Sequence, residues 1–111
     1  MDISFNTSGL HKLCTQRRLM VKRLGPSTAK KLMQRLADLQ ACDSLHEASF
    51  IPGRVHELSG DRRDQIAMHL HGGVRLIFVP DHDPMPRKPD GGLDRKSVTA
   101  IMVTEVGDYH D

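Results

Sequence analysis

The apolar residues of this chain change their spacing near Pro52, and this change limits what the chain can fold into. Before it, from Gly9 to Leu24 and from Ser27 to Ala41, apolar residues recur every three or four positions, which predicts two helices. Gly25-Pro26 lies between them, and glycine commonly follows a helix end whereas proline cannot continue a helix. Ser27 is the expected N-cap of the second helix. The sequence therefore predicts a helical hairpin.

After Pro52 apolar residues recur with a period of two, which indicates β-strands. Gly72-Gly73 has the composition of a two-residue hairpin turn. Ile3–Phe5 also alternates and could open a strand. We expect the other strands at Arg54–Leu58, Gln65–Leu70, Val74–Val79 and Val98–Val106. Residues 1–111 are thus predicted to form one α+β domain, with the helical hairpin packed on one face of a twisted antiparallel sheet.

Residues 80–97 interrupt this pattern between the last two expected strands. The segment holds four of the six prolines and two glycines of the chain and has almost no apolar content. Such a composition does not favour a packed element, so we expect a long mobile loop inserted in the domain.

Several protein classes are not expected from the composition. No run of 18 apolar residues is present that could span a membrane, and the N-terminal residues lack the pattern of a secretory signal. Two cysteines, Cys14 and Cys42, do not make a disulfide framework, and buried reduced thiols are the simpler interpretation. A cytoplasmic protein is therefore expected.

The charge is distributed unevenly along the chain. Residues 1–35 hold eight basic side chains and one acidic one, a net charge of +7, whereas the other 76 residues hold eight basic and thirteen acidic ones, a net charge of −5. This asymmetry favours contact with a polyanion, although basic side chains also simply solvate helix surfaces. The basic residues of this segment are Lys12, Arg17, Arg18, Lys22, Arg23, Lys30, Lys31 and Arg35.

The last five residues, Gly-Asp-Tyr-His-Asp, have the side chains of an active-site rim. Tyr109 is the only tyrosine of the chain, and it stands between Asp108 and His110 directly after an apolar strand. A frayed polar tail is the alternative. His56 in one strand and Arg75 in an otherwise apolar strand are further candidates, although each residue type is also common for structural reasons.

Together these side chains suit RNA cleavage. The ribose 2′-hydroxyl is the nucleophile, so a base must take its proton and an acid must protonate the departing 5′-oxygen. Histidine serves both proton roles near neutral pH, and arginine can stabilise the charge that develops on the phosphate. Neither a metal nor another cofactor is needed for this reaction.

The order of motifs resembles one known family. The chain has, in order, a helical hairpin, RVHELSGDRR, GGVRLIF and a final strand that ends in DYH. This order is similar to that of the HigB branch of the RelE superfamily, the toxins of bacterial toxin–antitoxin pairs. The similarity covers the chain apart from residues 80–97. It implies a RelE-like, microbial-ribonuclease type of fold and a ribosome-dependent messenger RNA endoribonuclease. It also implies a helix-turn-helix, HigA-like antitoxin that holds the toxin inactive in a hetero-oligomeric complex.

The resemblance also implies roles for individual residues. His56 matches the family's active-site histidine, Arg75 matches the arginine of its central strand, and Asp108, Tyr109 and His110 match its catalytic ending. The basic residues of the first 35 positions would then contact the ribosome.

The chain departs from the family pattern at several positions. Ser59 stands where the family has a lysine, and Arg62 or Arg63 could supply that positive charge near the RNA phosphate. His71 replaces a second arginine, and the family's tryptophans are replaced by Ile66 and Val74. A catalytically degenerate homologue that only binds the ribosome or the antitoxin is therefore the alternative function.

His69 and His71 allow one further interpretation. Two histidines separated by one residue on a strand can hold a metal, but no third ligand is evident nearby unless Asp81-His82-Asp83 folds back. An exposed polar strand face is the simpler interpretation, and no metal is expected.

Overall fold

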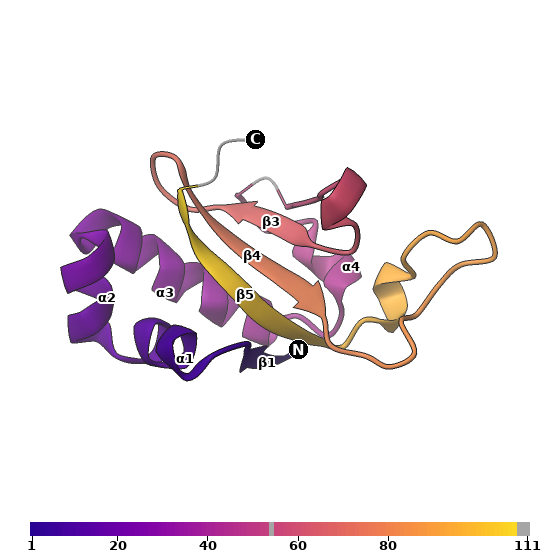
Figure 1. The fold of residues 1–111 in the computed structure, drawn as a ribbon, viewed down its shortest axis with the longest axis horizontal. Coiled ribbons are helices and arrows are strands. Elements are labelled where there is room, and N and C mark those ends of the chain that lie inside the picture. Colours follow the sequence, from indigo (N-terminus) through magenta and orange to yellow (C-terminus); the bar gives the residue numbers. More distant parts are fainter. Residues whose placement is uncertain (54, 109–111) are drawn as a thin grey trace.

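The computed structural model describes residues 1–53 and 55–108 and shows an α+β fold. Helices from the N-terminal half cover one face of a five-stranded sheet, and the whole measures 44 × 28 × 26 Å (Figure 1). In chain order the helices and strands are β1 (Asp2–Phe5), α1 (Ser8–Thr15), α2 (Arg17–Leu24), α3 (Pro26–Ala41), α4 (Leu45–Ala48), β2 (His56–Glu57), β3 (Ile66–His69), β4 (Val74–Pro80) and β5 (Ala100–Asp108), with short 3-10 helices η1 (Gly60–Arg62) and η2 (Arg95–Ser97).

The first predicted helix is divided in two. Gln16 has extended backbone angles, φ −107° and ψ 104°, so that α1 ends and α2 begins at this residue. Cys14 and Met20 are both buried, although they are six positions apart and would lie on different faces of one straight helix. The bend at Gln16 allows both side chains to reach the core, and the prediction of a simple hairpin is wrong here.

The second predicted helix begins one residue early. Gly25, with a φ of 83°, caps both α2 and α3, and Pro26 occupies the first turn of α3. Proline suits this position because its φ is already helical and the missing N–H has no partner there. Ser27 is consequently not the N-cap.

The sheet is mixed, with the strand order β1-β5-β4-β3-β2. The pairs β2–β3, β3–β4 and β4–β5 are antiparallel, as predicted. The expected strand at Ile3–Phe5 is present as β1, but it lies parallel to β5, so the prediction of a purely antiparallel sheet is wrong. The helices between β1 and the other strands allow this parallel return.

The hydrophobic core lies between the helices and one face of the sheet. Leu32 and Leu39 of α3 are fully buried there, together with Met68 of β3 and Phe78 of β4. Cys14 and Cys42 border this core as buried free thiols, as expected. Burial raises the pKa of the Cys14 thiol to about 11.

The segment 80–97 is better ordered than its composition suggests. Leu93 is buried in the core, and the backbone pairs Arg87 with Leu93. Lys88 N–H donates to the carbonyl of Gly92 at 2.7 Å, and Asp94 N–H donates to the carbonyl of Pro86 at 3.0 Å. The prediction that nothing in this segment packs is therefore wrong.

Within residues 1–53 and 55–108, none of the helices combines the length and the apolar character that crossing a bilayer requires.

Candidate active site

The strand register brings two of the predicted site residues onto one face of the sheet. Directly opposed residues of paired strands direct their side chains to the same face, and residues two apart on one strand share a face. We call the face that the helices do not cover the open face. One row across it is His56, Ala67, Ile77 and Glu105, and the adjacent row is His69, Arg75 and Gly107.

These two rows place His56 and Arg75 on the same face, two strands apart, with His69 on the strand between them. His69 of β3 lies directly opposite Arg75 of β4, a relationship in which Cβ atoms are about 5 Å apart. His56 lies diagonally across from His69, a relationship of about 7–8 Å. Two exposed imidazoles and one half-buried guanidinium therefore share a small area of the open face.

Arg75 has a different environment from the other arginines near the sheet. Arg62, Arg87 and Arg95 each form an ion pair with a carboxylate. No hydrogen bond or ion pair joins the side chain of Arg75 to another residue within 1–53 and 55–108. A half-buried cation with no protein counter-ion in this part of the chain is well suited to a phosphate.

Gly107 was not identified from the sequence. It lies opposite Arg75 on β5, and since it has no side chain it contributes no side-chain atoms beside the guanidinium. Glycine within a strand often marks a place where a ligand approaches closely. The available signal was a glycine in the last strand, but its pairing with Arg75 could be known only from the register.

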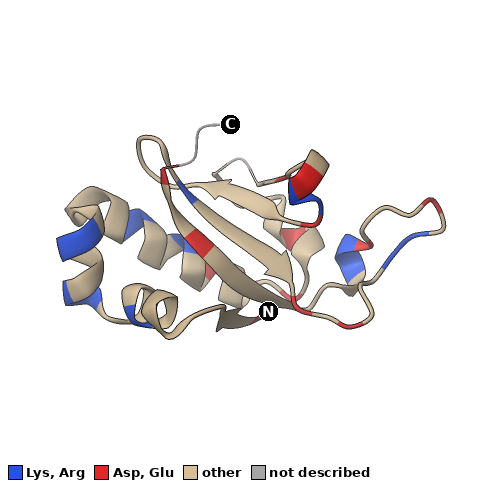
Figure 2. Ribbon diagram, in the orientation of Figure 1, with Lys and Arg blue, Asp and Glu red and all other residues tan. Residues whose placement is uncertain are grey.

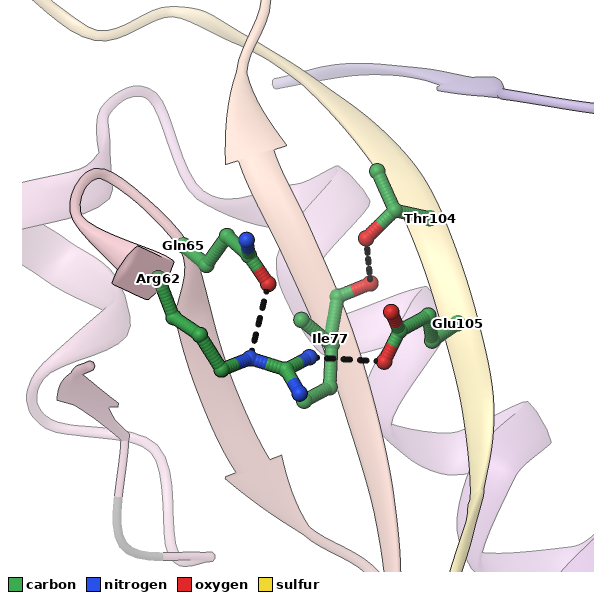
Figure 3. A network of polar contacts seen from close by, with 5 residues as sticks. All are labelled: Arg62, Gln65, Ile77, Thr104 and Glu105. Carbon is green, nitrogen blue, oxygen red and sulfur yellow. Dashed lines mark hydrogen bonds and ion pairs between the residues drawn. The ribbon is translucent and has the colours of Figure 1, made fainter. Parts of the chain in front are cut away.

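Arg62 crosses the open face above β3 and β4. Its Nε donates to Oε1 of Gln65 at 3.1 Å, and one Nη donates to Oε2 of Glu105 on β5 at 2.7 Å (Figure 3). Ala67 and Ile77 lie on the same face and are buried. The structure thus gives Arg62 a carboxylate partner, which largely compensates the charge that the sequence analysis assigned to RNA binding.

Arg63 lies in another part of the molecule's surface. One of its Nη groups donates to the carbonyl of Gly91 at 3.3 Å, so its guanidinium is turned toward the 80–97 segment. Of the two candidate replacements for the family's lysine, neither extends an unpaired charge next to Arg75.

The C-terminal candidates are only partly within the described residues. Asp108 ends β5 opposite Val74, and this register assigns it to the face opposite to Arg75. The predicted roles of Tyr109 and His110 fall outside the described residues.

The geometry does not bring a third metal ligand to His69. In the described ranges, no three His, Cys, Asp or Glu side chains are grouped so that they could hold a metal ion. His71 lies in the turn before β4, where its carbonyl accepts from Val74 N–H at 3.1 Å.

The basic side chains of the N-terminal segment gather at one end of the molecule, on α1, α2 and the first half of α3 (Figure 2). We call this surface the basic helices, and its exposed or half-buried residues are Lys12, Arg17, Arg18, Lys22, Arg23, Lys30 and Lys31. Arg35 does not belong to it: its side chain is buried and pairs with Asp38 at 2.9 Å. The prediction that Arg35 is part of an exposed patch is wrong.

The chain was compared with known proteins. No protein-family model matches it, and no curated protein shows significant similarity to it.

Proposed function

We propose that this protein is an endoribonuclease that cleaves messenger RNA on the ribosome and is the toxin of a toxin–antitoxin pair. The observation that carries the proposal is the placement of His56, His69 and Arg75 on one open sheet face, with no carboxylate paired to Arg75 among the described residues. A proton donor and a positive charge in this arrangement suit phosphodiester cleavage.

The reaction uses the RNA's own nucleophile. The 2′-oxygen attacks the neighbouring phosphorus, a base takes the 2′-proton, and the bond from phosphorus to the 5′-oxygen breaks as an acid protonates that oxygen. We assign His110 as the base and His56 as the acid, and these two roles can be exchanged. Arg75 stabilises the additional negative charge on the phosphate oxygens.

The remaining assignments follow from the family resemblance. Tyr109 positions or stacks on a base. The resemblance assigns Asp108 to orient an imidazole and stabilise its protonated form, although its register places it on the face opposite to His56 and Arg75. No metal or other cofactor takes part in this mechanism.

The basic helices support a large polyanionic partner. Seven cationic side chains on three consecutive helices form a surface that can contact ribosomal RNA through its phosphates. We also propose a cytoplasmic location, which the composition led us to expect, and, from the resemblance, a helix-turn-helix antitoxin as the second partner.

One observation favours a second function. Arg62, which was expected to replace the family's lysine at Ser59, is paired with Glu105. A homologue in which Glu105 neutralises the charge of Arg62 could bind the ribosome or the antitoxin without cutting RNA. The two functions differ in a single measurable property, the cleavage of messenger RNA.

The experiment that separates them compares messenger RNA with and without translating ribosomes. We expect cleavage on ribosomes and little cleavage of free RNA, because the chain has few groups to orient RNA by itself. In the same assay, His56→Ala and His110→Ala should lower single-turnover cleavage by about 10²–10⁴-fold each, with ribosome binding nearly unchanged.

His11→Ala is the matched control, since this exposed histidine lies on α1 and not on the open face. Equal cleavage with and without ribosomes contradicts ribosome dependence. Binding to ribosomes with no cleavage by the unmodified protein supports the degenerate homologue instead.

A further inference from the structure

The segment 86–96 encloses a second polar site, which the proposed mechanism does not use. A cavity of about 450 Å³ lies between α4, the edge strand β2 and this segment. Its polar lining comes from all three elements. The lining side chains with charge or a titratable ring are His46, Glu57, Lys88, Asp94, Arg95 and Lys96.

Both carboxylates of this cavity already have partners. Glu57 Oε2 is 3.3 Å from an Nη of Arg95, and Asp94 Oδ2 accepts a hydrogen bond from the hydroxyl of Ser97 at 2.8 Å. The two lysines of the cavity are less well neutralised by carboxylates. Lys88 Nζ is 3.8 Å from Asp90 with both side chains exposed, and Lys96 forms no ion pair within the described ranges.

The backbone of the segment holds these cations around the cavity. Lys88 N–H donates to Gly92 and Gly91 N–H donates back to Lys88, which closes a tight turn. Arg87 forms a two-pronged ion pair with Asp64, with N–O distances of 2.5 and 2.7 Å, and Leu93 is anchored in the core. Lys88 and Lys96 therefore extend from opposite ends of an anchored segment.

The size and charge of the cavity indicate its ligand class. A volume of 450 Å³ lies in the usual range of small-molecule sites and exceeds what a phosphate alone requires. Two ammonium groups provide donors for phosphate oxygens, and His46 adds an imidazole. We infer that this cavity binds a nucleotide through its phosphate group.

The nucleotide can be free or part of an RNA strand. Glu57, in one wall of the cavity, follows His56 in β2, and β2 is the edge of the sheet. An RNA strand on the open face could thus pass around this edge and place a neighbouring nucleotide in the cavity. The binding of a nucleotide within an RNA strand rests on the proposed function, whereas the binding of a free nucleotide does not.

The test is an NMR titration of the whole protein. Adenosine 5′-monophosphate should shift the backbone amide signals of Gly92, Leu93 and Lys96, whereas adenosine, with the same base and no phosphate, should leave them unchanged. Lys88→Ala combined with Lys96→Ala should weaken the affinity by about tenfold, as expected for the loss of two exposed charge contacts. Both side chains are exposed, so the fold is retained.

Gln34→Ala combined with Gln40→Ala is the control, because both side chains are exposed on α3, outside the cavity, and their loss should leave the affinity unchanged. Equal shifts with adenosine, or shifts confined to α1–α3, overturn the inference. A short single-stranded RNA tests the binding of a nucleotide within a strand: shifts at the same amides show that the cavity accepts an RNA nucleotide. If the protein cuts no RNA and the monophosphate still binds here, the proposed function fails while this site stands.

Discussion

At the residue scale, Arg75 and Arg62 provide a direct comparison on one sheet face. Both are half-buried arginines on the open face, but within residues 1–53 and 55–108 only Arg62 has a carboxylate partner, Glu105, at 2.7 Å. A guanidinium that already neutralises a carboxylate contributes little further positive potential to a bound phosphate. In the proposed mechanism we therefore assign transition-state stabilisation to Arg75.

Arg75→Gln should lower single-turnover cleavage on ribosomes by about 10²–10³-fold, a typical loss for one group that stabilises charge in the transition state. Arg62→Gln removes the same charge from the same face and should cost less than about tenfold. Urea unfolding of both variants checks their stability. Equal losses of activity in two folded variants contradict the distinction between the two arginines.

Gly107 leads to a second prediction at this scale. Gly107→Val places a branched side chain opposite Arg75, where it should hinder the approach of a phosphate. Valine favours strands, so the fold should be retained. We expect cleavage to fall by at least about tenfold, because the valine side chain hinders the phosphate, and we expect ribosome binding to stay unchanged. Val106→Ile is the control, since Val106 packs toward the core face. Full activity of Gly107→Val would show that no ligand approaches there.

At the element scale, the basic helices and the sheet have separable roles. Reversing the charges of Arg17, Arg18, Lys22 and Arg23 should weaken ribosome binding and reduce its dependence on salt, because fewer counterions are released. All four side chains are exposed on α2, and none is buried in the core. Binding measured over a salt series checks this. An unchanged affinity would mean that the basic helices serve another purpose.

The segment 86–96 is held to the sheet by an ion pair that depends on pH. The hydrogen bond from Arg87 lowers the pKa of Asp64, with Coulomb attraction adding to the effect and partial burial opposing it. A carboxylate with a lowered pKa in the folded state stabilises the protein above its unfolded value, near 3.8. That contribution is lost as the pH falls through this value toward the lower pKa of the folded state.

Asp64→Asn should therefore reduce stability at pH 7 and make little difference near pH 2. Urea unfolding at both pH values measures this, and Asp43→Asn is the control because Asp43 is exposed and has no ion pair in the described ranges. If Asp64→Asn lowers the free energy of unfolding by the same amount at both pH values, the ion pair does not have this role.

The elements also show how far sequence patterns reach. Periodicity predicted the helical segments 9–24 and 27–41 and the strands β1 to β5, because each depends on local spacing, but it did not predict the short helix α4. The bend at Gln16 depends on Cys14 and Met20 sharing one core, which is a tertiary effect. The parallel pairing of β1 with β5 joins residues 98 positions apart, and Leu93 is one apolar residue in a polar segment. None of these has a local signal.

The candidate site shows the same limit. His56 and Arg75 could be selected as residue types, but their common face depends on the register of three strands. A shift of the register by one residue would move either side chain to the other face. His69 was predicted to lie on an exposed polar strand face, with a metal pair as the other interpretation, and its position opposite Arg75 followed from β3–β4 pairing. Arg62 was selected by charge, and its pairing with Glu105 joins residues 43 apart.

At the scale of the whole molecule, the three surfaces to which we assign proposed roles lie along the long axis. The basic helices lie at one end, the segment 86–96 lies at the other, and the open sheet face lies between them (Figures 1 and 2). This order would allow the helices to hold a large RNA while the sheet acts on a thin strand. The cleavage chemistry is the central claim, since binding alone could be achieved without His56 and Arg75.

The chemistry of the cleaved ends tests that claim most directly. Messenger RNA cut on ribosomes by the whole protein should carry a 2′,3′-cyclic phosphate or 3′-phosphate on one fragment and a free 5′-hydroxyl on the other. A single 2′-deoxy substitution at the cleaved position should abolish the reaction, and EDTA should not affect it when ribosome integrity is maintained. A 5′-phosphate on the product, or cleavage of the 2′-deoxy substrate, would contradict the mechanism and return His69 and His71 to consideration as metal ligands.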